Sequence, residues 1–177
     1  MTYRLPALLL AALLGLSQCK KKADPAPADQ LPPATQTGAN TLGCLVNGQP
    51  WTPQGNAGTS NYTLYYDRFY RGGNFGVNTY RLSEGFAQYI IFGGDSIAAI
   101  GAYSLSRAPR TVFFSDSRKP AACQDYSGQA GQYARGTLII TRLDLQAGVV
   151  SGTFAFTLYK PGCDSIRVTQ GRFDKKL

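Results

Sequence analysis

The sequence predicts an all-β domain, a mainly antiparallel sandwich, preceded by a signal helix and a disordered tether. Short runs of aromatic and β-branched residues recur from residue 43 to the end, with Gly, Pro, Asn or Asp between them. After the first segment, no stretch sustains the i, i+3, i+4, i+7 apolar spacing of a helix. About nine or ten strands in one domain are typical of a sandwich or a barrel, so a closed or partly closed barrel is the alternative.

The first segment has the pattern of a secretory signal that ends in a lipid-attachment cysteine. Arg4 precedes an apolar run at residues 5–16. Cys19 comes three residues after this run and is followed directly by three lysines. The run is too short for a membrane span, which needs about 20 residues. It resembles a bacterial lipoprotein signal, although Gln18 stands where a small residue is usual. We expect residues 1–18 to be removed and Cys19 to carry acyl chains that anchor the protein in a membrane; the alternative is an ordinary secretory signal cut elsewhere.

The next segment, residues 19–40, is predicted to be a tether. It is rich in Pro and Ala and has no aromatic residue. Such a composition buries too little apolar surface to offset the entropy lost on ordering, and its prolines favour extended chain. Residues 41–177 are then long enough for one domain with its own core.

The domain opens with strands that are aromatic or β-branched. Residues 43–48 form a short apolar strand that ends at the Asn47-Gly48 turn, and Trp51 follows directly. The next expected strands, each justified by aromatic and β-branched content or by alternation, are residues 62–66, 74–80, 86–92, 97–105 and 111–115.

The clearest hairpin lies near the end of the chain. Residues 133–143 run out, residues 144–148 turn, and residues 149–159 return. In the returning strand Val150, Gly152, Phe154, Phe156 and Leu158 share one face, and mostly Ser and Thr share the other. One face is therefore expected in the core, and residues 165–173 supply a last strand.

The cysteines predict one disulfide. With Cys19 lipidated, three cysteines remain, and an oxidising envelope permits any of three single pairings. We favour Cys123 with Cys163, because both lie beside loop residues, whereas Cys44 sits within an apolar strand and behaves there as a small hydrophobe. The alternative is three reduced, buried thiols. No metal site is expected, because the chain has no histidine and no closely spaced cysteine pair.

Catalysis has little support in the sequence. The absence of histidine removes the usual triads and an imidazole base. Glu84 is the single glutamate, and the glycine pairs form no phosphate-loop or dinucleotide motif, so no cofactor is expected. A hydrolase with paired carboxylates would have to use aspartates that mostly sit in predicted turns, where Asp is common for local reasons. These are Asp67, Asp95, Asp116, Asp125, Asp144, Asp164 and Asp174.

A binding role has more support. Aromatic and basic residues are interleaved at residues 62–81, and an exposed set of this kind stacks on sugars or contacts proteins. Strands need aromatics in any case, which is the competing explanation. A formal net charge of +8 favours anionic surfaces. The candidate binding surface consists of Tyr65, Tyr66, Arg68, Phe69, Tyr70 and Arg71.

Five stretches carry a resemblance to a known family. They are residues 31–38 (Leu-Pro-Pro-Ala-Thr-Gln-Thr-Gly), 43–51 (Gly-Cys-Leu-Val-Asn-Gly-Gln-Pro-Trp), 101–105, 151–156 and 169–174 (ending Gly-Arg-Phe-Asp). They are similar to parts of small Bacteroidota lipoproteins of unassigned function. The resemblance implies a β-rich domain anchored in the cell envelope, at the outer membrane, and supplies no ligand residues.

Together these observations predict a lipid-anchored, non-catalytic binding or structural accessory module. A membrane would hold it through the N-terminal lipid, and a glycan or an envelope protein is the expected partner. Nucleic acid is not expected, since the domain is exported. The alternative is a hydrolase that acts on envelope or extracellular glycans through paired aspartates.

Overall fold

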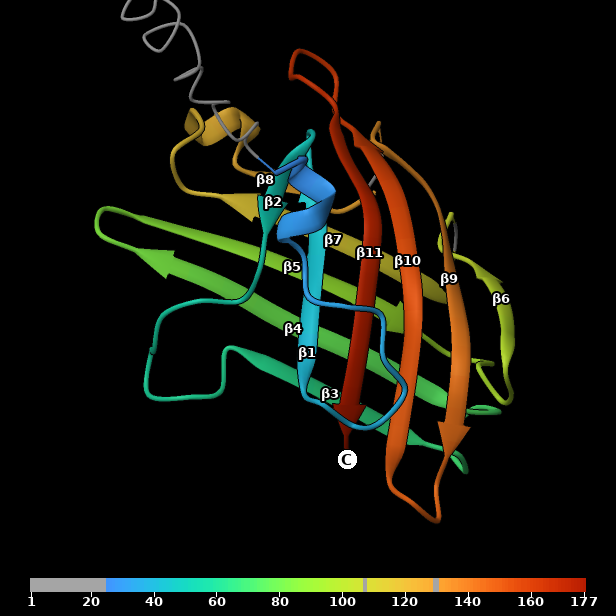
Figure 1. The fold of residues 1–177 in the computed structure, drawn as a ribbon. Coiled ribbons are helices and arrows are strands. Elements are labelled where there is room, and N and C mark those ends of the chain that lie inside the picture. The colour runs from blue at the N-terminus through green and yellow to red at the C-terminus, as the bar shows by residue number, and fades with distance from the viewer. Residues whose placement is uncertain (1–24, 107, 129–130) are drawn as a thin grey trace, which may run out of the picture.

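The computed structural model describes residues 25–106, 108–128 and 131–177, which form two antiparallel sheets packed face to face (Figure 1). The predicted all-β sandwich is confirmed: the described strands form two separate sheets rather than a closed barrel. The strands of the two sheets run in clearly different directions in Figure 1. The predicted signal peptide and Cys19 lie outside the described residues.

The strands divide between a six-stranded sheet A and a five-stranded sheet B. Sheet A has the spatial order β2 (Gln49–Trp51), β1 (Thr41–Val46), β11 (Ile166–Lys176), β10 (Val149–Tyr159), β9 (Tyr133–Asp144) and β6 (Gly101–Ser104). Sheet B has the order β3 (Tyr62–Asp67), β4 (Asn74–Ser83), β5 (Phe86–Gly94), β7 (Arg110–Asp116) and β8 (Asp125–Tyr126). Two short 3₁₀ helices are η1 (Pro27–Gln30) and η2 (Ala121–Cys123).

Most of the expected strands are present, and one is shorter than expected. The hairpin of β9 and β10 pairs as predicted, with the Val150 face buried. Of residues 97–105 only Gly101–Ser104 is a strand; Ile97 is buried in the preceding loop, where its N–H donates to the Gly73 carbonyl (2.9 Å). The strands β2 and β8 were not expected, because two or three residues carry too little pattern.

The core lies between the inner faces of the two sheets. Phe75 and Phe92 from sheet B meet Phe154 and Phe173 from sheet A, and the Phe92 and Phe154 ring centroids are 4.3 Å apart. All four side chains are buried. Aromatic contacts of this kind add about 0.5–1.5 kcal/mol each beyond the area they bury, so this cluster is a main link between the sheets.

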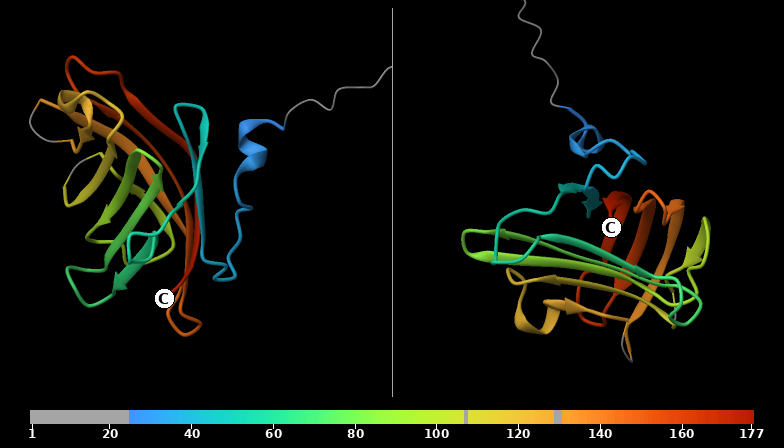
Figure 2. Two further views of the ribbon diagram at one scale, coloured as in Figure 1. Left: turned by 90° about the vertical axis from the view of Figure 1, so that its left-hand side faces the viewer. Right: turned by 90° about the horizontal axis from the view of Figure 1, so that it is seen from below.

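Residues 31–40, here called the strap, lie on the outer face of sheet A (Figure 2). Leu31 is buried, and the Pro32 ring packs against Gly43 of β1. A Cβ added at Gly43 would come within 2.6 Å of that ring. The chain therefore reaches β1 only after crossing the sheet. Among the described residues, no helix is long and apolar enough to cross a membrane.

Asp174 fastens the strap to β11. Its side chain is 1% exposed, and all its hydrogen-bond donors are uncharged. These donors are Thr35 Oγ1 (2.7 Å), Thr37 N (2.9 Å), Thr37 Oγ1 (3.3 Å), Gly38 N (2.8 Å), Ala39 N (3.1 Å) and Ser151 Oγ (2.7 Å). Burial opposes ionisation, but these donors outweigh it and hold the pKa of Asp174 well below its usual range. We call Asp174 and these donors the clasp.

The clasp corrects the prediction that the whole of residues 19–40 is a disordered tether. Residues 31–40 are part of the folded domain. Composition predicted disorder because the segment has few apolar side chains, but its backbone N–H groups and threonines find a buried carboxylate far along the chain. Three stretches that are distant in the sequence, residues 31–38, 151–156 and 169–174, meet at the clasp.

Candidate functional site

A hollow of about 390 Å³ lies at the end of the sandwich where the β1–β2 hairpin approaches the turn after β7. We call it the end hollow. It combines an apolar floor with cationic side chains, which are the usual ingredients of a small-ligand site. Its lining residues are Val46, Asn47, Gln49, Pro50, Trp51, Arg81, Gln88, Phe114, Asp116, Arg118, Lys119 and Ile166.

Strand register creates the polar wall of the end hollow. Arg81 on β4 pairs with Gln88 on β5, and Gln88 pairs with Asp116 on β7. Directly opposed residues in neighbouring strands point to the same face, so the three side chains form one row. The next row inward contains Ile90 and Phe114, which are buried in the core. The inner face of sheet B is thus apolar in its middle and polar at this end.

A hydrogen-bonded chain runs from the floor to the rim of the end hollow. Trp51 Nε1 donates to Gln88 Oε1 (3.0 Å), and Gln88 Nε2 donates to Asp116 Oδ2 (2.7 Å). Arg118 donates to both carboxylate oxygens, from Nη2 to Oδ2 (2.8 Å) and from Nε to Oδ1 (3.0 Å). Burial alone would raise the pKa of Asp116, but the hydrogen bonds and charge of Arg118, with Gln88, lower it to about 2. Asp116 is therefore an anion at any ordinary pH.

Cationic side chains outnumber the carboxylate in the lining. The Arg118 guanidinium lies over the Phe86 ring, 4.3 Å from its centroid, while its edge holds Asp116. Arg81 Nη1 donates to the Pro50 carbonyl (3.3 Å), and its buried Nε has no hydrogen-bond partner. Neither Arg81 nor Lys119 has a carboxylate within ion-pair distance in the described part of the chain. The end hollow therefore carries a net positive charge.

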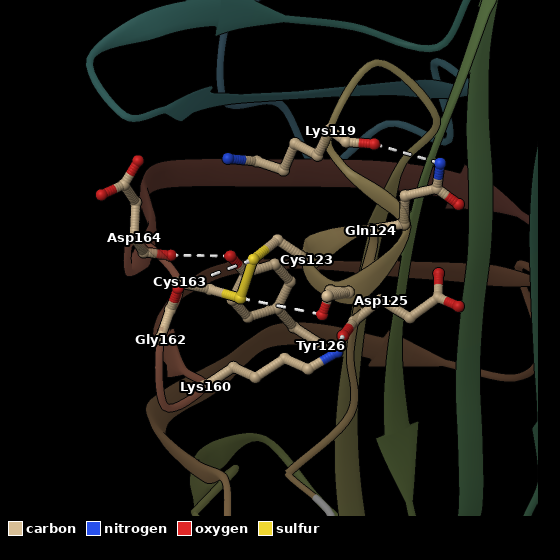
Figure 3. The surroundings of a disulfide bond; sticks show 10 residues. Lys119, Cys123, Gln124, Asp125, Tyr126, Lys160, Gly162, Cys163 and Asp164 are labelled. Atoms are coloured by element: carbon tan, nitrogen blue, oxygen red, sulfur yellow. Dashed lines mark hydrogen bonds between the residues drawn. A yellow bond between two sulfur atoms is a disulfide. The ribbon is translucent and has the colours of Figure 1, made fainter.

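The predicted disulfide between Cys123 and Cys163 is present, and it lies at this end of the sandwich (Figure 3). Cys123 ends η2, which follows the turn after β7, and Cys163 lies in the loop between β10 and β11. The bond thus joins the two sheets beside the end hollow. Tyr126 Oη reinforces it by donating to the Asp164 carbonyl (2.7 Å). Cys44 is free and buried in β1, as expected, and burial raises the pKa of its thiol.

The predicted aromatic–arginine surface lies at the opposite end of β4, around the β3–β4 turn. Tyr65, Phe69 and Tyr70 are exposed, with Phe69 87% exposed, whereas Tyr66 is half-buried. Two arginines lie beside these rings: Arg68 is 5.1 Å from the Phe69 centroid and Arg71 is 5.1 Å from that of Tyr70.

The remaining large ring of that surface is also engaged. The Tyr65 ring lies over Gly76 of β4, where a Cβ would come within 2.2 Å of it. Arg71 is held by Asp95, from Nη1 to Oδ2 (3.2 Å). These rings remain exposed, but the arginines beside them lie against the surface's own rings or pair with Asp95. The end hollow, which combines a concave lining with unpaired cations, is the better candidate site.

The aspartates considered for a hydrolase occupy different places and have different partners. Asp95 binds Asn74 and Arg71, Asp116 binds Gln88 and Arg118, and Asp174 binds the strap. Asp67 accepts from the backbone of its own turn, and Asp144 pairs with Arg142. Asp125 and Asp164 are exposed beside the disulfide. No group of three or more residues suited to hold a metal occurs within residues 25–106, 108–128 and 131–177.

The sequence did not reveal the end hollow because its residues are dispersed. Arg81 and Gln88 flank a hairpin, whereas Arg118 and Lys119 come much later, and each resembles an ordinary surface residue. The available signal was Gln88, a polar residue at an inward position of an otherwise apolar strand. Comparison of the chain with protein-family models, curated proteins and solved structures found no match.

Proposed function

We propose that this protein is a lipid-anchored, non-catalytic binding module of the bacterial envelope, and that its end hollow binds a small anionic ligand. The observation that supports the binding role is the convergence of Arg81, Arg118 and Lys119 over a floor that contains Trp51 and Phe114. Cations attract a phosphate or carboxylate, and the apolar floor suits the carbon skeleton attached to it. An acidic glycan fragment or a phosphorylated headgroup has this chemistry.

The anchor and the location are part of the same proposal. The short apolar run before Cys19 and the resemblance to envelope lipoproteins support acylation of Cys19 and a place at the outer membrane. The disulfide fits an oxidising compartment. Mass spectrometry of the protein expressed in a bacterial host should find a mature chain that begins at acylated Cys19. An unmodified Cys19, or cleavage at another position, would reject the anchor.

Binding is favoured over hydrolysis by the state of the one carboxylate in the end hollow. A general acid must hold a proton near its working pH, and Asp116, with a pKa of about 2, does not. Its oxygens are already used by Arg118 and Gln88. The role that fits Asp116 is to position Arg118 at the rim.

Ligand titration tests the proposal. Residues 25–177 contain both sheets, the core and the disulfide, so the chain from residue 20 onward is a suitable sample. Glucuronate and glycerol phosphate should bind and perturb the fluorescence of Trp51, the single tryptophan, whereas uncharged glucose should not. Lys119→Gln should weaken binding about tenfold, and Lys176→Gln, an exposed charge at the far end of β11, should change it less than about twofold. Equal affinity for glucose, or no effect of Lys119→Gln, would reject the site.

A further inference from the structure

The described chain begins at the end of the domain that contains the end hollow. The helix η1 lies against β2 and β1, and β2 supplies Gln49, Pro50 and Trp51 to the lining. In Figure 1 the blue η1 lies near β2, at the upper end of sheet A, whereas the C-terminus lies at the lower end. Figure 2 shows the same arrangement from the side. The N-terminal end of the domain and the end hollow therefore share one pole of the molecule.

The strap keeps this pole close to the proposed anchor. Because the clasp holds the strap on the outer face of sheet A, the free connection is shorter than residues 19–40. Residues 19–25 span at most about 20 Å even when fully extended. If Cys19 is embedded in the membrane, residue 25 is held within that distance of the headgroups, and the pole with the end hollow is kept near the membrane. A disordered tether through residue 40 would have left the orientation free.

The charges at this pole are arranged for a ligand that enters the end hollow. Arg81 and Lys119 lie in the lining without a paired carboxylate, whereas Asp125 and Asp164 are exposed on the flank beside the disulfide. The lining of the end hollow therefore carries three cations and one carboxylate, Asp116. Such a distribution suits a single phosphate group better than a uniform anionic surface.

We infer that the end hollow binds the phosphate-bearing headgroup of a lipid in the same membrane that holds the anchor. This inference rests on the proposed function for both the anchor and the anion site. Arg81 and Lys119 bind the phosphate, Arg118 closes the rim, and the glycerol or sugar part of the headgroup lies on Trp51 and Phe114. The lipid anchor and the end hollow then fix both the distance and the orientation of the domain.

Vesicle flotation tests this inference with the chain from residue 20 onward, which lacks the acylated cysteine. The vesicles are phosphatidylcholine alone, or phosphatidylcholine with a minority of phosphatidylglycerol. We expect binding to the second kind only. Arg81→Gln/Lys119→Gln should lower the partition coefficient at least about tenfold. The control Arg68→Gln/Lys176→Gln removes the same charge from exposed sites at the other end and should lower it less than about threefold.

The possible results distinguish failure of this inference from failure of the proposed function. Equal losses in the two double variants would mean general attraction to charge and would overturn the inference. Binding of free glycerol phosphate without binding to vesicles would also overturn it, while the anion site of the proposed function would stand. Absence of both kinds of binding would overturn the inference and the anion site together. The single variant Lys119→Gln, which removes no described hydrogen bond of its side chain, gives the same comparison if the double variant does not fold.

Discussion

The two buried aspartates Asp174 and Asp116 have different partners and different roles in the molecule. Asp174 accepts hydrogen bonds only from uncharged donors of the strap and of Ser151, and it is buried. Asp116 instead pairs with the guanidinium of Arg118, and it lines the end hollow. Both carboxylates have lowered pKa values, so a perturbed pKa alone does not distinguish them. What distinguishes a structural carboxylate from a site carboxylate here is the charge and accessibility of its neighbours.

The clasp should contribute mainly to the stability of the fold, and the cations of the end hollow mainly to binding. The clasp joins three distant stretches of sequence, so its loss should affect folding and the strap. The end hollow has a rim of long cationic side chains, so its changes should affect binding and leave the fold intact. The disulfide should affect both stability and binding, because it stabilises the fold and lies beside the end hollow.

The largest effect should come from removal of the disulfide. The chain-entropy model gives a loss of about 4 kcal/mol in the free energy of unfolding for a bond that closes a loop of this length, here a sequence separation of 40. Urea denaturation of Cys123→Ser/Cys163→Ser measures it. Cys44→Ala, which removes a free buried thiol, should cost only about 1 kcal/mol. A disulfide variant no less stable than Cys44→Ala would contradict the bracing role.

Loss of the clasp carboxylate should have the next largest effect. Asp174→Ala leaves buried donors of the strap and Ser151 unsatisfied, so we expect a loss of about 3 kcal/mol in the free energy of unfolding and faster proteolysis at residues 35–39. The matched control Asp144→Ala removes a half-exposed carboxylate paired with Arg142 and should cost less than about 1 kcal/mol. Equal stability of the two variants would show that the clasp does not hold the strap.

Acid should weaken the clasp in a definite pH window. The pKa of Asp174 in the native state lies below the value of about 3.9 in an unfolded chain. As the pH falls below that value, the unfolded state takes up a proton before the native state does, so the free energy of unfolding decreases. Urea denaturation between about pH 6 and pH 3 should show this fall, and Asp174→Asn should remove a large part of it. A variant with the same acid profile as the natural chain would contradict the assignment, since Asp116 would then account for the fall.

Local patterns predicted much of the fold. Alternation placed β9 and β10 and the buried face that contains Phe154, and the loop setting of Cys123 and Cys163 predicted the disulfide. Both signals are contained within a few neighbouring residues, which is why a single sequence sufficed.

The features that the sequence did not predict depend on contacts between distant residues. The strap looks disordered until Asp174 provides an acceptor for its N–H groups. The polar row of Arg81, Gln88 and Asp116 exists only because strand register aligns them. The aromatic–arginine turn is exposed, and its role in binding stays a prediction; its arginines lie beside its own rings, which composition alone does not reveal.

The most direct test of the distinction between the clasp and the end hollow is an NMR titration of the chain from residue 20 with glycerol phosphate. The indole N–H of Trp51, which donates to Gln88 in the end hollow, is a unique reporter, and the backbone N–H of Gly38 reports on the clasp. We expect saturable shifts of the Trp51 indole and the Lys119 backbone signals, with the Gly38 signal unchanged. Shifts confined to residues 68–71, or no saturable shift of Trp51, would contradict it.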